Sequence, residues 1–365
     1  MRATQSYSLT VPLVMALLVV LPLVSSTTAG SLPSGAGGSN RLGLLVADQT
    51  LEGAVDSHPH LIGSCLRGDI PFSDAYDPSA GYVYVSTGSV ISIVKPPCEV
   101  IKSITLGAGS GNVGGVSYDP LTREIVAIDQ ASAVAYVIHG LTLVKTVSLG
   151  GADHCPFAAG WDAALAAVLV TDVCGGIDLL YLTDVNGSTR AAVILDAFDQ
   201  GNSPTAVLAA DGYVFAAGNR VDVYNDRTLR FVGSFGLSSE GAVSPDPIAW
   251  DPLNETVVLA GSPPSLDHVV VLFLSANSIA TGLFTYSYLY PHDILNYAIG
   301  GVAFSTTNHE VYLTAAGGND VWELAPSGTM THTYLQSGDS GLYGLAYDVS
   351  NRDMYVCGLS LYVVS

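Results

Sequence analysis

The chain has 365 residues, of which only 12% are charged, and its 12 Lys and Arg against 32 Asp and Glu give a formal net charge of −20. This balance excludes a nucleic-acid-binding surface, because neutralising phosphates requires clustered Lys and Arg side chains. The 49% hydrophobic content excludes an intrinsically disordered chain. Polar helix formers are scarce, whereas Gly and Asp, which favour turns, and Val, Thr and Tyr, which favour strands, are common, so we expect an all-β protein.

The first 29 residues have the organisation of an export signal. Arg2 supplies a positive charge, residues 11–24 form an apolar run of 14 residues, and small residues lead to Ala29, a suitable cleavage position. A run of this length fits a signal peptide better than a bilayer-spanning helix, which needs about 20 residues. The alternative is an uncleaved N-terminal membrane anchor. Residues 30–42 are rich in Gly and Ser and are expected to form a flexible linker.

The protein is therefore expected to be secreted or held at the cell surface, with the membrane contacted only through this N-terminal segment. The remainder, residues 43–365, is expected to be one domain.

A repeated segment organises that domain. The sequence AYDPSAGYVYVSTG at 75–88 recurs with changes, and each clear copy carries an Asp after an aromatic residue. The clear copies lie at 75–88, 117–129, 160–172, 249–261 and 346–358, and the weaker copies lie at 208–218 and 303–317. In the weaker copies Asp211 and Thr306 stand in for the marker Asp. The markers are 40 to 55 residues apart, which matches the blade length of a β-propeller, about 40–50 residues.

Each repeat divides into four short strands, named A to D from the inside of the ring outward. In the first repeat strand A leads to Tyr76, and strands B, C and D are expected at 81–86, 89–94 and 100–106. Such runs of β-branched and aromatic residues between turn residues predict strands, and none has helical periodicity. The Asp-Pro pairs that begin at Asp77, Asp119 and Asp251 are interpreted as A–B turns and not as catalytic carboxylates.

The two ends of the domain predict how the ring closes. The last repeat stops at Ser365 after three strands, and residues 60–66 precede the first repeat in the position of a fourth strand. We expect this N-terminal strand to complete the last blade and remove its open edge. Residues 43–48 resemble another strand with no assigned place. The predicted fold is an all-β, seven-bladed β-propeller of four-stranded antiparallel blades, with repeats near residues 71, 113, 156, 204, 245, 299 and 342.

The repeat resembles the YVTN-type β-propeller repeats. The resemblance is carried by PFSDAYDP at 71–78, YVYVS at 82–86 and SVISIV at 89–94, and it extends over about residues 60–365. It implies the propeller fold and a place among secreted and surface-layer proteins of archaea and periplasmic propellers of bacteria. It implies little about activity, because propellers host many unrelated functions. The copies around Asp211 and Thr306 depart most from the pattern.

The five cysteines of an exported chain predict disulfides with one thiol left over. Cys155 and Cys174 lie in the D–A and B–C loops of the third repeat, which emerge at the same end of a blade, so we expect them to pair. Cys65 and Cys357 both belong to the closing blade, but an intervening strand would separate them by about 9–10 Å. A disulfide spans only about 4.4–6.8 Å between Cα atoms, so these two cysteines could pair only if a loop bends, and the pairing among Cys65, Cys98 and Cys357 stays open. Cys98, in a C–D turn at the other end, is expected to be the unpaired thiol.

Two sequence motifs predict surface modification. Asn186 and Asn254 each begin an Asn-X-Ser/Thr sequon in an expected turn, and both are candidates for N-glycosylation in an exported protein.

Catalytic signatures are missing from the sequence, which contains no HExxH, CxxC or P-loop motif. The glycine-rich segment 109–114 leads into a strand, so it lacks the helix N-terminus that would bind a phosphate. The D–A loops around the expected channel mouth carry carboxylates and imidazoles, namely Asp69, Asp153, His154, Asp246, His292, Asp293 and Asp339. Such a ring predicts binding of Ca²⁺ or another divalent cation. The alternative is that these residues only solvate turns.

Three functions remain open from the sequence. The first is a non-enzymatic extracellular propeller that binds protein or glycan partners in adhesion or envelope association. The second is a secreted hydrolase or lactonase-like enzyme with a metal-assisted site at the channel mouth. A redox propeller with a quinone or copper ranks last. The scarcity of charge also predicts tolerance of an acidic exterior, since carboxylates protonate near their ordinary pKa of about 4 and their mutual repulsion fades.

Overall fold

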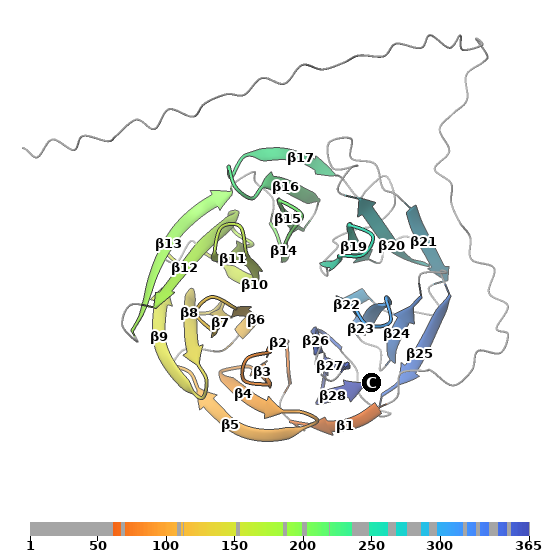
Figure 1. Cartoon of the computed structure of the whole chain (residues 1–365), viewed down its shortest axis with the longest axis horizontal. Coiled ribbons are helices and arrows are strands. Elements are labelled where there is room, and N and C mark those ends of the chain that lie inside the picture. Colours follow the sequence, from red (N-terminus) through yellow and green to blue (C-terminus); the bar gives the residue numbers. More distant parts are fainter. Residues whose placement is uncertain are drawn as a thin grey trace, which may run out of the picture. The chain divides into compact units, whose positions relative to one another are not determined.

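The strands form seven four-stranded antiparallel sheets that are arranged as blades around a ring (Figure 1). This computed structural model describes residues 61–364 apart from the segments 67–69, 108–110, 112, 151–153, 185–187, 199–202, 219, 236–247, 262–267, 276–285, 292–297, 317–319, 326–328, 336–341 and 349–351. All of these residues belong to one compact unit, Leu42–Ser365. The predicted signal peptide or anchor, the linker and the strand at 43–48 lie outside the described residues.

Each of the first three blades takes four consecutive strands, in order from the inner to the outer edge. The first blade consists of β2 (Ser73–Asp77), β3 (Tyr82–Thr87), β4 (Val90–Lys95) and β5 (Glu99–Thr105). The second consists of β6 (Val113–Asp119), β7 (Glu124–Asp129), β8 (Val134–His139) and β9 (Thr142–Ser148). The third consists of β10 (Pro156–Asp162), β11 (Ala167–Asp172), β12 (Ile177–Asp184) and β13 (Thr189–Phe198).

The next three blades follow the same plan, and the closing blade combines both ends of the domain. The fourth blade consists of β14 (Ala206–Ala210), β15 (Tyr213–Ala217), β16 (Val221–Asn225) and β17 (Phe231–Phe235). The fifth consists of β18 (Ile248–Asp251), β19 (Thr256–Gly261), β20 (His268–Ser275) and β21 (Tyr286–Pro291). The sixth consists of β22 (Ala298–Phe304), β23 (Val311–Ala316), β24 (Asp320–Leu324) and β25 (Met330–Tyr334). The closing blade consists of β26 (Leu345–Asp348), β27 (Asp353–Cys357), β28 (Leu361–Val364) and β1 (Leu61–Cys65).

Apolar packing between neighbouring blades holds the ring together. The innermost strand of each blade contacts the innermost strand of the next, and β26 contacts β2. The buried hydrophobic residues fall into clusters that each span one junction between blades. Middle strands such as β7 and β11 are buried along their whole length, whereas the outer strand β9 alternates between exposed and partly buried residues. The core is therefore formed by the packed faces of the blades. The alternation of exposed and partly buried side chains is found in the outer strand.

The ring closes through the N-terminal strand, as predicted. β1 pairs antiparallel with β28, so the closing blade contains strands from both ends of the domain. Cys65 and Cys357 lie opposite the same residue, Leu361, on its two sides. The expected separation of these two cysteines by one strand is therefore confirmed.

The predicted unpaired thiol was wrong. Cys98 forms a disulfide with Cys65, with 5.7 Å between their Cα atoms, and the free cysteine is the buried Cys357. Strand twist accumulates across a four-stranded blade, so its outermost strand runs along the circumference of the ring (Figure 1). The end of β1 therefore reaches the β4–β5 turn of the first blade, where Cys98 lies.

The marker Asp residues cap the turn between strands A and B, which confirms the prediction that they are structural. Asp77 Oδ1 accepts hydrogen bonds from the backbone N–H groups of Ser79 and Ala80 at 2.8 and 3.2 Å. Asp119, Asp162 and Asp251 do the same in their own repeats. Each carboxylate thus accepts hydrogen bonds from backbone N–H groups that the four-residue turn leaves without strand partners.

The two weak repeats use other turn chemistry. Asp211 and Gly212 both have positive φ and join β14 to β15 as a two-residue hairpin, for which Asp-Gly is a preferred sequence. In the sixth blade Ser305, and not Thr306 as predicted, occupies the marker position. Its Oγ accepts hydrogen bonds from the backbone N–H groups of Thr307 and Asn308 at 3.3 and 3.4 Å. A serine oxygen can cap a turn in the same way as a carboxylate, though more weakly.

The last residue of the A–B turn, or the last but one in the sixth blade, adopts a left-handed conformation in most repeats, with φ between 49° and 69°. These residues are Gly81, Arg123, Ala166, Glu255, His309 and Arg352. Because a Cβ atom is disfavoured there, Ala166→Gly is expected to raise the free energy of unfolding by about 0.5–1 kcal/mol. Ala164→Gly, in the same exposed turn but at negative φ, should instead lower it. Urea denaturation of both variants checks this, and a loss of stability in Ala166→Gly would contradict it.

Candidate functional site

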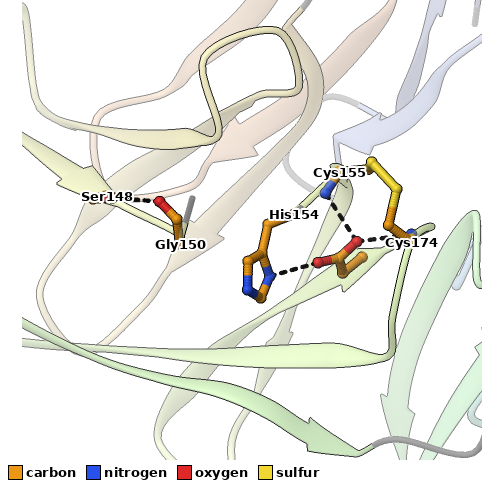
Figure 2. A network of polar contacts seen from close by, with 6 residues as sticks. Ser148, Gly150, His154, Cys155 and Cys174 are labelled. Atoms are coloured by element: carbon orange, nitrogen blue, oxygen red, sulfur yellow. Dashed lines mark hydrogen bonds and ion pairs between the residues drawn. A yellow bond between two sulfur atoms is a disulfide. The ribbon is translucent and has the colours of Figure 1, made fainter. Parts of the chain in front are cut away.

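His154 and Asp172 form a hydrogen-bonded pair where two loops of the third blade meet. His154 precedes β10, the innermost strand, and Asp172 ends β11. The imidazole Nδ1 of His154 lies 2.7 Å from Oδ2 of Asp172 (Figure 2). The side chain of Asp172 is 1% exposed and that of His154 is 17% exposed. The pair is thus a buried carboxylate that orients a partly accessible imidazole.

The other oxygen of Asp172 fixes the two loops to each other. Its Oδ1 accepts hydrogen bonds from the backbone N–H groups of Cys155, at 2.9 Å, and Cys174, at 2.8 Å. The predicted disulfide between these two cysteines is confirmed, with 5.4 Å between their Cα atoms. The backbone N–H of Val173 also donates to the carbonyl oxygen of Cys155 at 3.1 Å. The carboxylate is therefore held by two donors on one side and by the imidazole on the other.

Comparison with the second blade explains why this Asp is available. Asp129 ends β7 as Asp172 ends β11, and it caps its B–C turn through the N–H of Ala131 and the hydroxyl of Ser132 at 3.0 and 2.7 Å. In the third blade the turn uses only Oδ1, and His154 takes the place of the serine hydroxyl. A repeated turn residue has thus become the partner of a histidine.

Gly150 provides the space for the imidazole. It has φ of +113°, and a Cβ atom built on it would lie 2.3 Å from Cδ2 of His154. Its carbonyl oxygen accepts a hydrogen bond from the hydroxyl of Ser148 at 3.0 Å, and the two residues lie beside His154 in Figure 2. The backbone of the preceding loop therefore packs directly against the ring.

Gly150→Ala is expected to displace the His154 ring and break its hydrogen bond to Asp172, because the added methyl group overlaps the ring and its φ is unfavourable for alanine. The Nδ1–H proton signal of His154 in an NMR spectrum should disappear or move, whereas that signal should be kept in Gly140→Ala, a change at a left-handed glycine with open space around it. An unchanged His154 signal in Gly150→Ala would contradict the expectation.

Asp178 is the third ionisable side chain of this cluster. It lies in β12, is fully buried, and has a carboxylate oxygen within 4.8 Å of the donor atoms of His154 and Asp172. His154 was predicted as a site residue from the sequence, whereas Asp172 and Asp178 were not. Such a cluster can hold a divalent cation, orient a histidine as a general base, or present the imidazole to a polar ligand.

Most of the predicted channel-mouth ring lies outside the described residues. Of its seven members only His154 is described, and Asp69, Asp153, Asp246, His292, Asp293 and Asp339 are not. The ring therefore stays a prediction. Asn186 also lies outside the described residues, whereas Asn254 is exposed in the β18–β19 turn, where its Nδ2 donates to Asp251 Oδ2 at 2.7 Å.

A second polar cluster lies in the sixth blade, beside its A–B turn and thus at the end of the ring opposite to His154. Asn308 Nδ2 and the hydroxyl of Tyr312 both donate to Glu323 Oε1, at 3.1 and 2.9 Å. Burial, reinforced by hydrogen bonding and repulsion from Glu323, raises the pKa of Glu310 to about 8. These contacts join strands within one blade, so we interpret the cluster as part of the folded core.

Comparison with solved structures identifies the architecture. A streptogramin B lyase superimposes with a TM-score of 0.65 and 12% sequence identity, over 83% of this chain and 95% of that chain. The fold is that of a β-propeller. A virginiamycin B lyase from Staphylococcus aureus gives a TM-score of 0.64 at 12% identity, over 83% and 97% of the two chains. The propeller domain of Cps50 (Swd1) from Myceliophteria thermophila gives 0.63 at 11% identity, over 84% and 99%.

At this level of identity the likeness to these propellers establishes the fold and not the activity. No family model matches the chain. No curated protein matches it either. The two disulfides are typical of a protein that folds in an oxidising compartment. In the described part of the chain, no helix has the length and apolar character needed to cross a membrane.

Proposed function

We propose that this chain is an exported, seven-bladed propeller of the YVTN type that acts at the cell surface or outside the cell as a binding protein. Its ligand would bind at the end of the ring formed by the D–A and B–C loops. The observation that carries the proposal is the His154–Asp172 pair, which fixes an imidazole at that end through a buried carboxylate. Disulfides, the apolar run at 11–24 and the repeated turn motif support export and the family assignment.

The pair is suited to recognition because it is rigid before any ligand arrives. Asp172 holds one ring nitrogen of His154, and the Cys155–Cys174 disulfide holds the loop. A group that is already in place loses little conformational entropy on binding. The second ring nitrogen is left for a polar partner. A hydroxyl group both donates and accepts hydrogen bonds, so a hydroxyl-rich glycan of the envelope fits this group whichever nitrogen carries the proton.

Binding to immobilised cell-envelope polysaccharide tests the proposal. Wild-type protein is expected to bind, and His154→Ala to bind at least about tenfold more weakly, the effect of losing a polar contact of about 1.4 kcal/mol. His309→Ala is the matched control, because His309 is exposed in an A–B turn at the other end of the ring. Equal binding by wild type and His154→Ala would overturn the assignment of the loop face.

The same geometry favours one enzymatic alternative, a hydrolase in which His154 acts as general base. A histidine oriented by a buried carboxylate can take a proton from water during attack on an ester or lactone. A screen of ester and lactone substrates distinguishes the two functions. Turnover that disappears in His154→Ala and persists in His309→Ala would replace the binding function with the enzymatic one.

A further inference from the structure

We propose that His154, Asp172 and Asp178 form a binding site for a divalent metal ion of the zinc type, located where the second and third blades meet. One donor atom from each residue lies within 4.8 Å of the other two. A tetrahedral zinc site, with metal–ligand distances of 2.0–2.2 Å, places its ligands about 3.4 Å apart, so small side-chain movements would complete it. This inference goes beyond the proposed function, because metal binding can be measured whether or not a glycan binds.

Both carboxylates are buried against apolar side chains. Asp172 lies on the same face of β11 as Val168 and Val170, and Asp178 lies on the same face of β12 as Leu180, because side chains alternate along a strand. These three apolar residues belong to the cluster between the second and third blades. Asp172 and Asp178 are 1% and 0% exposed. Two negative charges in such surroundings are costly unless positive charge lies beside them, and a bound divalent cation would supply that charge.

The neighbouring blade shows how the chain stabilises an aspartate at this position. Asp222 in β16 corresponds to Asp178 in β12, since each is the second residue of its strand and pairs with a residue close to the end of strand B, Ala216 for Asp222 and Val170 for Asp178. Asp222 is fully buried and bound by Arg220, with 2.7 Å between Nε and Oδ1. The residue corresponding to Arg220 in the third blade is Gly176. The third blade therefore replaces an arginine by a glycine and gathers His154 and Asp172 around the carboxylate instead.

The donor set selects the kind of metal. One imidazole nitrogen with two carboxylate oxygens suits Zn²⁺ or Mn²⁺, whereas Ca²⁺ prefers six to eight oxygen ligands. The sulfur atoms of Cys155 and Cys174 are joined in a disulfide and do not ligate the ion. The backbone N–H groups of Cys155 and Cys174 donate hydrogen bonds to Asp172 Oδ1 and so fix the orientation of its carboxylate. Hydrogen bonds from groups around a metal site orient the metal ligands in the same way. The partial exposure of His154 leaves a coordination position for water or a ligand.

Titration calorimetry with ZnCl₂ on the full-length, oxidised and previously chelator-treated protein tests the site. We expect one ion to bind and the unfolding temperature to rise with zinc. His154→Ala and Asp178→Asn should each weaken zinc binding at least about tenfold. Asp222→Asn is the matched control, because it changes a buried aspartate at the equivalent position without touching the cluster, and its zinc affinity should equal that of the wild type.

Cobalt substitution identifies the ligands independently. A Co²⁺ complex with oxygen and nitrogen donors should show visible d–d bands without the near-ultraviolet charge-transfer band of a cobalt–thiolate bond. The proposal is overturned if wild type binds no zinc, if His154→Ala binds zinc as tightly as wild type, or if Ca²⁺ binds more tightly than Zn²⁺. His154 is partly exposed, so its alanine variant decides the matter even if Asp178→Asn does not fold.

Discussion

Replacing Cys65 and Cys98 by serine is expected to lower the free energy of unfolding by about 4 kcal/mol, because the disulfide closes a loop of 33 residues in the unfolded chain. The loss of stability is expected to affect the closing blade most. Cys65 ends β1, the outermost strand of the closing blade, and the bridge ties it to the first blade. Without the bridge, β1 is held on one edge only, by its ladder to β28.

Hydrogen exchange locates this effect. In the double serine variant the amides of β1 and β28 should exchange faster than those of the other blades, because the closing blade can open locally before the ring unfolds. The matched control is the Cys155→Ser, Cys174→Ser variant, which removes a disulfide of sequence separation 19 within the third blade. That variant should lose about 3 kcal/mol and keep β1 protected. Unchanged exchange in β1 after loss of the Cys65–Cys98 bridge would show that the ladder alone closes the ring.

The fold was predictable because its signals are local. Strands expected at 81–86, 89–94 and 100–106 are found at Tyr82–Thr87, Val90–Lys95 and Glu99–Thr105. Their boundaries follow from turn residues and from runs of β-branched and aromatic residues, which any short window of the sequence contains. The closure by an N-terminal strand followed from counting strands in the last repeat.

Contacts between blades were not predictable in the same way. The Cys65–Cys98 bridge depends on the direction of outer strands, which strand twist sets over a whole sheet. Asp172 was missed because Asp129, at the same place in the second repeat, is an ordinary turn residue. A signal was nevertheless present. Because Cys155 and Cys174 were expected to pair, the neighbouring His154 and Asp172 had to come together.

Asp74 illustrates a buried charge that sequence patterns do not reveal. It lies in β2, the innermost strand of the first blade. Its side chain is buried where that blade meets the closing blade, and the thiol of Cys357 donates a hydrogen bond to it. Burial raises the pKa of Asp74 from its ordinary 3.8 to about 7, although the hydrogen bond from Cys357 acts in the opposite direction. Burial also raises the pKa of the Cys357 thiol well above its usual value, so the thiol stays protonated.

The protein is expected to become more stable as the pH falls from 8 to about 5. Between the ordinary pKa of Asp74 and its raised value near 7, the folded chain holds a proton that the unfolded chain releases. The contribution of this proton to stability is fully present below pH 4 and is lost as the pH rises through 7. It amounts to at most about 4 kcal/mol, from three pKa units at 1.36 kcal/mol each. The raised pKa values of Asp162, Asp353 and Glu310 act in the same direction.

Unfolding temperatures measured from pH 3 to 8 test this, and Asp74→Asn isolates the responsible group. An amide has nearly the shape of a protonated carboxyl group and does not titrate, so the variant should be more stable than wild type at pH 8 and should show a flatter pH profile. Asp211→Asn, an exposed aspartate in a hairpin turn, should leave the profile unchanged. Two outcomes would contradict this expectation: a wild-type protein that is most stable at pH 8, or an Asp74→Asn variant that is less stable than wild type at pH 8. Either would show that Asp74 is ionised in the folded chain. The buried carboxyl group would then give no support to the predicted tolerance of an acidic exterior.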